Sequence, residues 1–269
     1  MKAAVIQLVS GIDVDGNLQA SRRLIKQAAS QGAELVVLPE NFASMEKVDN
    51  DKLDIMESLG KGKIQSFLSD ISREFSIWIV AGTIPTESSV DGKVYASSLL
   101  YDSFGNCVAV YNKIYLFDVQ IPGTAEKYLE SKFTLAGTEI VTQNTPLGKI
   151  GLSVCYDIRF PELYRKLLES GAALIAVPSA FTKRTGNAHW ELLLRARAVE
   201  NSCFVLAANQ GGAHENGRET FGHSMIIDPW GEVLAQVKTG EGYAIAEIDL
   251  EHQKKIRENF PAISHRKRL

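Results

Sequence analysis

The sequence has few cysteines and no long apolar run. Its 269 residues include three cysteines, Cys107, Cys155 and Cys203, and such a sparse, odd set argues against a disulfide framework and favours a reducing compartment. No window approaches the ~20 apolar residues that span a bilayer. The N-terminal stretch MKAAVIQLVSG has too short an apolar core for a signal peptide. We therefore expect a cytoplasmic protein with no membrane partner.

The sequence also lacks an excess of charge of one sign and a metal-binding pattern. The formal net charge is −3, and the only basic run, HRKRL at 265–269, is short and terminal. This balance gives no electrostatic support for a nucleic-acid partner. The five histidines do not have the spacing of metal ligands. We expect neither a metal nor a cofactor.

What the sequence does contain is an alternation of short apolar strands and amphipathic helices, with 45% hydrophobic residues in an ordinary globular composition. The apolar runs ELVVLP at 34–39 and IWIVAG at 77–82 are typical of strands covered on both faces. Turn residues at 103–106, 146–148 and 229–231 predict three hairpins. The pattern indicates an α/β fold.

A weak internal repeat divides the chain into two similar halves. The segments GAELVVLPE at 32–40 and GAALIAVPS at 171–179 share Gly-Ala-x-Leu and a proline, and each follows an amphipathic helix. Two halves that mix helical crossovers with hairpins predict a two-sheet sandwich with helices outside. The chain has no linker or low-complexity segment, so we expect one domain over residues 1–269.

The stretch KIGLSVCYDIRFPELYR at 149–165 places a thiol where a strand gives way to a helix. Peptide N–H groups and the positive end of a helix dipole at such a position lower the pKa of a thiol and favour the nucleophilic thiolate. Pro161 suits the first turn of the following helix. Buried cysteines are mostly inert, so the position of Cys155 alone does not establish catalysis.

Two further polar residues follow predicted strands. Glu40 ends the apolar run ELVVLPE, and Lys113 ends CVAVYNK. A carboxylate and an ammonium group at the ends of inner strands can meet Cys155 at one rim of the sandwich, where they would supply a base and a charge stabiliser to the thiol. Singly, each residue only marks where its strand leaves the core, but together they favour a catalytic site.

The blocks LPENF, YNKIYLFD and GLSVCYDIRFPEL resemble the three signature blocks of the nitrilase, or carbon–nitrogen hydrolase, superfamily. Order and spacing agree along nearly the whole chain, and Glu40, Lys113 and Cys155 match the Glu-Lys-Cys triad of that superfamily. A second glutamate of the superfamily matches Glu130 in YLESK, although Glu126 is nearby. The resemblance implies a four-layer α-β-β-α sandwich that usually pairs as a homodimer and requires no cofactor.

The resemblance also implies a mechanism for hydrolysing a small-molecule amide. Cys155 attacks the carbonyl while Glu40 takes the thiol proton, and Lys113 with the backbone N–H of Tyr156 stabilises the oxyanion. Ammonia leaves to give a thioester, which water activated by Glu40 then hydrolyses. The positions that match substrate-pocket positions of the superfamily are Asn41, Phe181 and Thr182.

Within the superfamily, RFPEL, LLRARA and GHSMIIDPWG resemble the deaminated-glutathione amidases, repair enzymes that act on a side product of transaminase action on glutathione. Such a substrate asks for a cation near an α-keto carboxylate, and Arg159 is the nearest candidate. Arg159 could equally form a structural ion pair with Asp157 or Glu162.

Several alternatives stay open. One is an ω-amidase that acts on α-keto amides such as α-ketoglutaramate, and others are a small aliphatic amidase, a carbamoylase or a nitrilase of the same superfamily. Outside enzymes, the chain could be a catalytically silent binding relative or a redox sensor that uses Cys155. The intact triad argues against the first, and the lack of an evident resolving cysteine argues against the second.

The remaining candidates are expected to be structural. Cys107 and Cys203 begin apolar strands and are expected to pack in the core. We expect His189 and His223 to form structural hydrogen bonds. The segment NQGGAHENG at 209–217 is expected to be a flexible loop, which either lies near the pocket or only connects strands.

Overall fold

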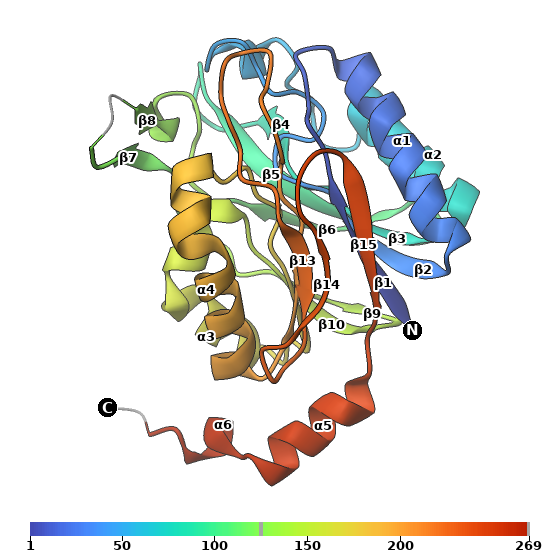
Figure 1. Cartoon of the computed structure of the whole chain (residues 1–269). Coiled ribbons are helices and arrows are strands. Elements are labelled where there is room, and N and C mark those ends of the chain that lie inside the picture. Colours follow the sequence, from blue (N-terminus) through green and yellow to red (C-terminus); the bar gives the residue numbers. More distant parts are fainter. Residues whose placement is uncertain (124–125, 268–269) are drawn as a thin grey trace.

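The computed structural model describes residues 1–123 and 126–267, and its centre is two mixed β-sheets that pack face to face (Figure 1). The first sheet has seven strands in the order β15-β1-β2-β3-β5-β4, with β6 also paired to β5, and the second has six in the order β14-β13-β12-β11-β10-β9. A separate two-stranded sheet joins β7 to β8. The α/β fold with two packed mixed sheets is as predicted.

The strands of the first sheet are β1 (Lys2–Gln7), β2 (Ala33–Val37), β3 (Trp78–Val80), β4 (Ile84–Glu87), β5 (Val94–Tyr101), β6 (Cys107–Asn112) and β15 (Gly242–Glu247). Those of the second are β9 (Thr142–Thr145), β10 (Gly148–Leu152), β11 (Leu174–Ala176), β12 (Phe204–Ala207), β13 (Ser224–Ile227) and β14 (Val233–Val237). The small sheet consists of β7 (Asp118–Gln120) and β8 (Lys127–Leu129).

The α-helices are α1 (Val14–Ser30), α2 (Lys63–Phe75), α3 (Pro161–Glu169), α4 (Lys183–Asn201), α5 (Leu250–Asn259) and α6 (Ala262–His265). Short 3-10 helices are η1 (Asp51–Leu53), η2 (Glu130–Lys132) and η3 (Cys155–Arg159). Helices α1 and α2 lie on the outer face of the first sheet, and α3 and α4 lie on the outer face of the second (Figure 1). The arrangement gives the four layers that the sequence comparison implied.

The side chains of the central strands of the first sheet alternate between two hydrophobic cores, as the two-residue period of a β-strand requires. In β1, Val5 faces the core between the sheets, whereas Ile6 faces the core beneath α1 and α2. In β2, Val37 likewise faces the core between the sheets, and Val36 faces the core beneath α1 and α2. Because both faces of these strands are covered, their sequences are continuously apolar rather than alternating.

The internal repeat corresponds to two β-α-β-α-β units. Strands β1, β2 and β3 are parallel neighbours joined through α1 and α2, and β10, β11 and β12 are parallel neighbours joined through α3 and α4. The three predicted hairpins are also present, as β5–β6, β9–β10 and β13–β14. Parallel strands end at a common edge, which brings residues distant in the sequence to one rim of the sandwich.

Local signals place the helix ends. Asp13 caps α1 by accepting hydrogen bonds from the N–H groups of Asp15 and Gly16. The N-cap of α2 is Gly62, which has no side chain, and Glu57 takes its place by accepting from the N–H of Ile64 at 2.6 Å. A carboxylate at a helix N-terminus is favoured by the helix dipole.

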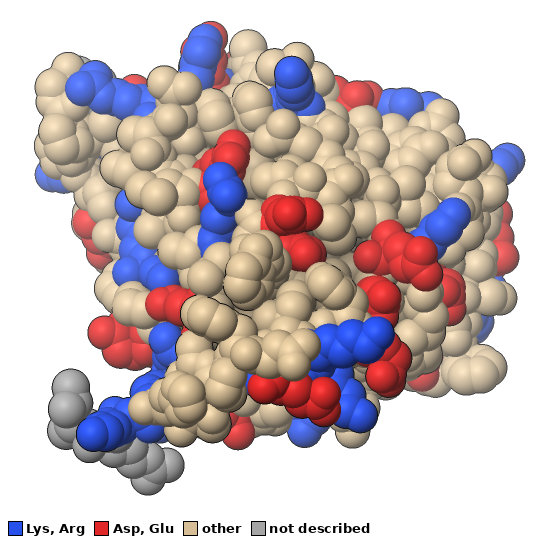
Figure 2. Space-filling view, turned by 60° about the horizontal axis from the view of Figure 1, so that its bottom comes forward, with Lys and Arg blue, Asp and Glu red and all other residues tan. Residues whose placement is uncertain are grey.

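The charged side chains on the surface are of mixed sign. Acidic and basic side chains are interspersed over the face shown in Figure 2, with no extended area of one sign.

Cys203 is buried as predicted, but Cys107 is exposed, so its assignment to the core is wrong. Cys107 lies at the start of β6, where only part of the strand is covered. Within residues 1–123 and 126–267, none of the helices is long and apolar enough for a bilayer crossing.

Candidate active site

Cys155 lies in a sharp turn between β10 and α3. The strand ends three residues earlier than the sequence pattern indicated, at Leu152, and Cys155 opens the short helix η3. Its φ is +46°, a left-handed conformation that is uncommon for a residue other than glycine. Its N–H donates to the carbonyl of Pro178 at 2.8 Å. Backbone strain of this kind persists where surrounding contacts hold the turn in place.

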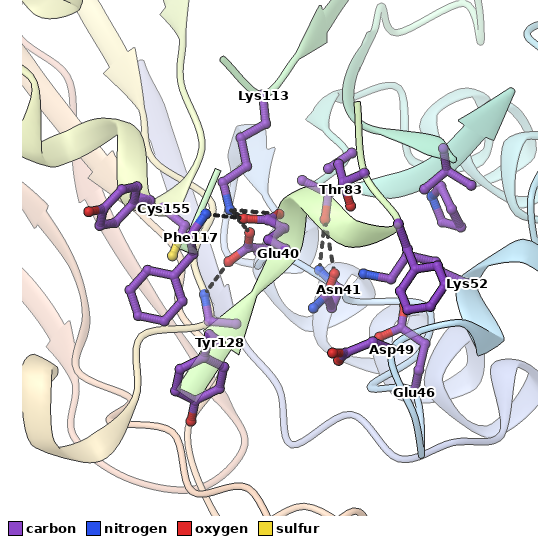
Figure 3. A pocket seen from close by; sticks show the side chains of 18 of the residues that line it. Glu40, Asn41, Glu46, Asp49, Lys52, Thr83, Lys113, Phe117, Tyr128 and Cys155 are labelled. Carbon is purple, nitrogen blue, oxygen red and sulfur yellow. Dashed lines mark hydrogen bonds and ion pairs between the residues drawn. The ribbon is translucent and has the colours of Figure 1, made fainter. Parts of the chain in front are cut away.

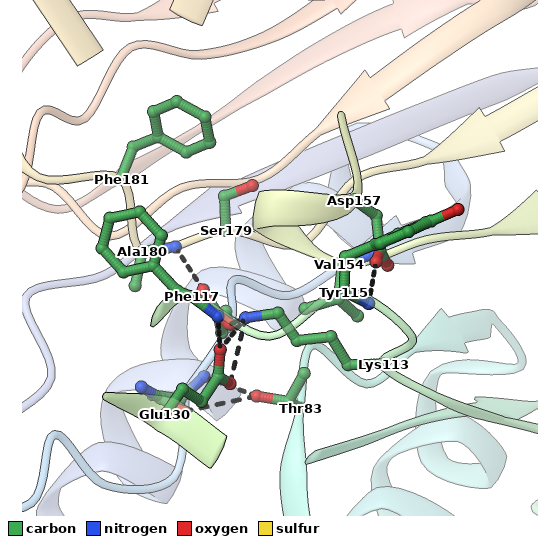
Figure 4. Close-up of polar contacts among 12 residues, drawn as sticks. Thr83, Lys113, Tyr115, Phe117, Glu130, Val154, Asp157, Ser179, Ala180 and Phe181 are labelled. Atoms are coloured by element: carbon green, nitrogen blue, oxygen red, sulfur yellow. Dashed lines mark hydrogen bonds and ion pairs between the residues drawn. The ribbon is translucent and has the colours of Figure 1, made fainter. Parts of the chain in front are cut away.

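Asp157 supplies those contacts, and the sequence reasoning did not find it as part of the site. Its buried carboxylate accepts hydrogen bonds from the N–H of Val154 at 2.8 Å and the N–H of Tyr115 at 2.9 Å (Figure 4). It also accepts one from the hydroxyl of Tyr111 at 2.7 Å. Burial raises the pKa of Asp157 to about 6, although these hydrogen bonds oppose the shift. Asp157 thereby ties the turn at Cys155 to the segment after Lys113.

Lys113 lies at the centre of a buried charge cluster. Its Nζ donates to Glu40 Oε1 at 2.8 Å and to the two carboxylate oxygens of Glu130 at 3.0 and 2.9 Å (Figure 3). The lysine side chain is only 2% exposed. Burial lowers its pKa, but the two carboxylates outweigh burial and hold the pKa well above its ordinary value of 10.5. Lys113 is therefore a fixed positive charge.

Glu40 bridges the two sheets. One carboxylate oxygen accepts from Lys113, and the other accepts from the N–H of Ala180 at 2.8 Å. Burial raises the pKa of Glu40, but Lys113 and a hydrogen bond from Cys155 outweigh it, so the pKa lies below its ordinary value of 4.5. Glu40 is ionised at neutral pH and its carboxylate meets the thiol, as a general base must.

The thiol of Cys155 is neutral rather than poised as a thiolate. Burial and the Glu40 carboxylate raise its pKa well above the ordinary value of 9.0, and the Lys113 ammonium only partly opposes them. The prediction that the strand-to-helix position lowers this pKa is therefore wrong. The removal of the thiol from water raises its pKa more than the local peptide dipoles lower it. A thiol in this position needs a neighbouring base to become a nucleophile.

Two backbone N–H groups lie next to the thiol. The N–H of Tyr156 follows the left-handed turn and has no acceptor in the described part of the chain. The N–H of Ala180, already bonded to Glu40, also faces the Cys155 sulfur. Free or shared N–H groups beside a nucleophile can bind an oxyanion.

Glu130, and not Glu126, joins the cluster. Besides its two bonds from Lys113, Glu130 Oε2 accepts the N–H of Phe117 at 2.6 Å, which fixes the carboxylate (Figure 4). Glu126 instead accepts from the hydroxyl of Tyr128 at 2.8 Å. The geometry therefore agrees with the resemblance that matched Glu130 in YLESK to the second glutamate of the superfamily.

One pocket brings together every residue predicted for the site. Its walls include Glu40, Asn41, Lys113, Glu130, Cys155, Tyr156, Arg159, Phe181 and Thr182. Asn41 has a φ of +57° and is held by a bond from its N–H to Thr83 Oγ1 at 2.9 Å.

Arg159 faces this pocket without an acidic partner. Its guanidinium lies 5.4 Å from the ring centroid of Phe181 and 5.7 Å from that of Tyr156, and it contacts His189 Nδ1 at 3.3 Å. It forms no salt bridge with a described carboxylate, Asp157 and Glu162 included, and Asp157 is instead occupied by Val154, Tyr115 and Tyr111. The structural ion pair considered from the sequence is absent.

The loop after β12 does more than connect strands. Gln210 Nε2 donates to the carbonyl of Glu40 at 3.0 Å and to Ser10 Oγ at 2.8 Å. Asn209 Oδ1 accepts from the N–H of Phe181 at 3.0 Å. Both side chains are fully buried, and they fix the base and one pocket wall. The dipeptide Asn-Gln gave no signal in the sequence, because its partners lie 28 residues away for Asn209 and 170 and 200 residues away for Gln210.

The pocket also has a polar side that the sequence reasoning missed. Glu46, Asp49 and Lys52 line it, and Figure 3 shows them on the side away from Cys155, beyond Asn41 and Thr83. Arg218 and Tyr128 line it as well. Across the described residues, no group of three or more His, Cys, Asp or Glu side chains is arranged to hold a metal ion.

Fold and site together are those of an α-β-β-α sandwich that brings a thiol, two carboxylates and an ammonium group into one pocket. The family model described as carbon-nitrogen hydrolase matches residues 2–258, and the chain belongs to that family. Carbon–nitrogen bond hydrolysis is thus the class of its chemistry.

Individual relatives agree with this assignment. The chain is 42% identical over 267 residues to the deaminated glutathione amidase of Synechocystis sp., covering 98% of this chain and 97% of the relative. It is 42% identical over 266 residues to the Caenorhabditis elegans nitrilase and fragile histidine triad fusion protein NitFhit, covering 98% of this chain but only 60% of that longer protein. Similar identity extends to the human deaminated glutathione amidase, at 41% over 268 residues.

Solved structures give the same result. The crystal structure of C. elegans NitFhit superposes with a TM-score of 0.91 over 99% of this chain and 65% of that chain, at 41% identity. Saccharomyces cerevisiae Nit3, described as a member of branch 10 of the nitrilase superfamily, superposes with a TM-score of 0.87 at 31% identity, covering 97% of this chain and 94% of that chain. The predicted superfamily and fold are confirmed.

Proposed function

We propose that this chain is a thiol amidase whose substrate is deaminated glutathione, that is, glutathione with its α-amino group replaced by a keto group. The observation that carries the proposal is the contact of the Cys155 thiol with a Glu40–Lys113–Glu130 cluster, in a pocket that also contains the unpaired Arg159. The names of the relatives in Synechocystis sp. and Homo sapiens support the same substrate.

In the proposed reaction, Cys155 Sγ forms a bond to the amide carbonyl carbon as Glu40 takes the thiol proton. Lys113 Nζ and the N–H of Tyr156 stabilise the oxyanion, which forms where preorganised positive groups already lie. The C–N bond then breaks, and the proton held by Glu40 passes to the leaving nitrogen. Water, deprotonated by Glu40, attacks the thioester, and the proton returns to the sulfur as the acid leaves.

Glu130 is a positioning residue in this proposal. Its carboxylate balances the charge of Lys113 and, through the bond from Phe117, holds the lysine against Glu40. Arg159 binds the α-keto carboxylate of the acyl group, while Asn41, Phe181 and Thr182 shape the pocket around it. Guanidinium groups suit carboxylates because they form paired, charge-assisted hydrogen bonds.

The leaving group differs from the ammonia expected from the sequence. In deaminated glutathione the scissile nitrogen belongs to cysteine, so the amine that leaves is the dipeptide cysteinylglycine, and the acid product is 2-oxoglutarate. Ammonia leaves only from a primary amide such as α-ketoglutaramate, the substrate of the alternative ω-amidase function. The two substrates share an acyl group, so Arg159 and the triad suit both.

The test is a comparison of the two substrates with purified protein. We expect the wild-type protein to release cysteinylglycine from deaminated glutathione with a higher kcat/KM than it releases ammonia from α-ketoglutaramate, and Cys155→Ala to do neither. A reversed preference would assign the chain to the ω-amidases. Turnover of neither substrate would contradict both functions and favour a silent relative or another amidase of the superfamily.

We also propose that the chain acts as a single-domain protein in a homodimer, in a reducing compartment such as the cytoplasm. The free thiols of Cys155 and Cys203 suit such a compartment. Helix α4 exposes Leu192 and Val199, which lie seven residues apart on one face, at 68% and 51% exposure. Light scattering should give twice the 29.5 kDa chain mass, and a monomeric mass would contradict the dimer.

A further inference from the structure

The pocket contains more positive charge than the acyl group of the proposed substrate uses. Arg159, Lys52 and Arg218 all line it. None of the three has a carboxylate of residues 1–123 or 126–267 within the 4.0 Å of a salt bridge, although Lys52 and Arg218 both act to lower the pKa of Glu46. Lys113, in contrast, is paired with two carboxylates. Unpaired cations around a cavity attract anionic ligands. With Arg159 assigned to the α-keto carboxylate, two cations are left without a function.

Arg218 is the better placed of these two. It lines both the catalytic pocket and a second, outer hollow, and Tyr128 is the other residue common to both. The guanidinium carbon lies 5.3 Å from the Tyr128 ring centroid. Arg218 therefore lies between the catalytic pocket and the outer hollow. Lys52 lies on the side of the pocket away from Cys155, where Glu46 and Asp49 also line the wall and oppose an anionic ligand (Figure 3).

The backbone around Arg218 is well held for a surface loop. Its N–H donates to Asn216 Oδ1 at 3.0 Å, and its carbonyl accepts from the N–H of His214 at 2.9 Å. Asn216 Nδ2 in turn donates to the carbonyl of Glu46 at 2.7 Å, which ties the loop to the opposite wall of the pocket. His214 is anchored by Ser10 and Thr220. These bonds hold the backbone at Arg218, and a side chain that starts from a fixed backbone loses less entropy when it binds a ligand.

We propose that Arg218 binds a carboxylate carried by the leaving amine. When an amide is held with its acyl carboxylate at Arg159 and its carbonyl at Cys155, its amine substituent can extend along the same pocket to Arg218, which also lines the outer hollow. The pocket thus selects amides with an anionic group on both sides of the scissile bond. This inference rests on the proposed function and extends it, because it makes Arg218 the residue that separates peptide-like from primary amides.

A second role for Arg218 has to be distinguished from this one. Its positive charge also contributes to lowering the pKa of Glu40. A purely electrostatic role would change turnover of every substrate equally, because all substrates use the same base. A binding role would change only substrates with the distal carboxylate. The ratio of kcat/KM values for two substrates therefore separates the two roles.

The experiment uses three substrates: deaminated glutathione, its C-terminal glycinamide, and α-ketoglutaramate. In Arg218→Gln we expect kcat/KM for deaminated glutathione to fall about 10- to 100-fold relative to α-ketoglutaramate, mainly through KM, as for loss of a charge-assisted contact. In the wild type, kcat/KM for the glycinamide should be lower than kcat/KM for deaminated glutathione by a similar factor. Arg218→Gln should not lower kcat/KM for the glycinamide any further relative to α-ketoglutaramate. Lys183→Gln is the matched control, because Lys183 lines only the outer hollow and pairs with Glu219 at 2.9 Å.

Each outcome has a distinct meaning. If the wild type cleaves deaminated glutathione and its glycinamide equally well, Arg218 does not bind that carboxylate, whatever the variant does. If Arg218→Gln slows all three substrates by one factor, its role is electrostatic and the inference is wrong. If the wild type cleaves none of them, the proposed function fails and the inference fails with it. Arg218→Lys, which keeps the charge, should restore part of the lost selectivity.

Discussion

The two β-α-β-α-β halves of the molecule share a backbone but not a chemistry. Gly32 and Gly171, which follow the first helix of each half, have φ values of +88° and +87°. Ser76 and Ser202, which follow the second helix, are both left-handed caps, with φ of +53° and +45°. The agreement of these unusual conformations shows that the repeat extends to single residues and is not confined to strand order.

The difference between the halves lies at the strand ends. After the central strand and its proline, the first half has Glu40 and the second has Ser179. After the first strand of each half, it is the second half that has the reactive residue. The strand registers show that Leu8 of the first half occupies the position that Cys155 occupies in the second. Glu40 faces the pocket, whereas Ser179 Oγ turns back to the carbonyl of Val177 at 3.3 Å.

The first half therefore provides the carboxylate of Glu40, and the second provides the thiol of Cys155. At the corresponding positions the other half has the inert residues Ser179 and Leu8. Lys113 comes from neither repeat unit but from the end of the β5–β6 hairpin. The hydrogen bond from Ala180 of the second half to Glu40 of the first joins them. A repeated scaffold thus gives an asymmetric site, which forms only when the two sheets pack together.

The largest expected effect comes from removing the reactive group of either half. Cys155→Ala and Glu40→Gln should each lower kcat by at least about 10⁴-fold, because nucleophile and base act as a unit. Steady-state kinetics with deaminated glutathione measures this. Cys203→Ala is the control, since Cys203 packs in the core of the second half away from the pocket, and it should keep its turnover. Activity retained in Cys155→Ala would show that the second half does not supply the nucleophile.

The next largest effect should come from the residue outside the repeat. Lys113→Met should lower kcat by about 10²- to 10³-fold through loss of oxyanion stabilisation. It should also cost about 3–5 kcal/mol in free energy of unfolding, because Glu40 and Glu130 lose their buried partner. Denaturant unfolding measures this change in the free energy of unfolding. Lys183→Met, which removes an exposed pair, should change it by no more than about 1 kcal/mol. Equal stabilities for the two variants would contradict the buried cluster.

The pH dependence of kcat/KM tests whether Glu40 is the general base. Because the pKa of Glu40 is lowered from 4.5, the acid limb should lie below pH 4.5. The lowered value also means that Glu40 contributes stability that is present above about pH 4.5 and is lost as the pH falls through the folded pKa. In Lys113→Met, burial acts on Glu40 without the opposing ammonium, so the acid limb should move to higher pH. An unmoved limb would show that another group is the base.

The smallest effect should come from the inert counterpart of Glu40. Ser179→Ala removes one long hydrogen bond to Val177 and should cost no more than about 1 kcal/mol in free energy of unfolding. Its kcat should stay within about twofold of the wild type, because the side chain donates away from the pocket. A large loss of turnover would mean that the two halves share the chemistry more evenly than their geometry indicates.

The sequence by itself determined the fold class and the three central residues of the site. Continuous apolar runs specify strands that are covered on both faces, and the Gly-Ala-x-Leu repeat specifies two halves. Glu40, Lys113 and Cys155 were visible because each follows such a run directly, and local pattern is what a sequence records. The superfamily resemblance added Glu130, Tyr156, Arg159 and the other pocket positions, all of which line the same pocket.

Only the tertiary structure decided the protonation states and the supporting contacts. The thiol pKa of Cys155 is raised because burial outweighs the local dipoles, and burial is a property of the packed sheets. Gln210 and Asp157 hold the site through hydrogen bonds to residues far away in the chain, so no local motif marks them. Arg218 gains its position from a loop bonded across the pocket. Strand and helix patterns are local, whereas desolvation and long-range contacts exist only in the folded chain.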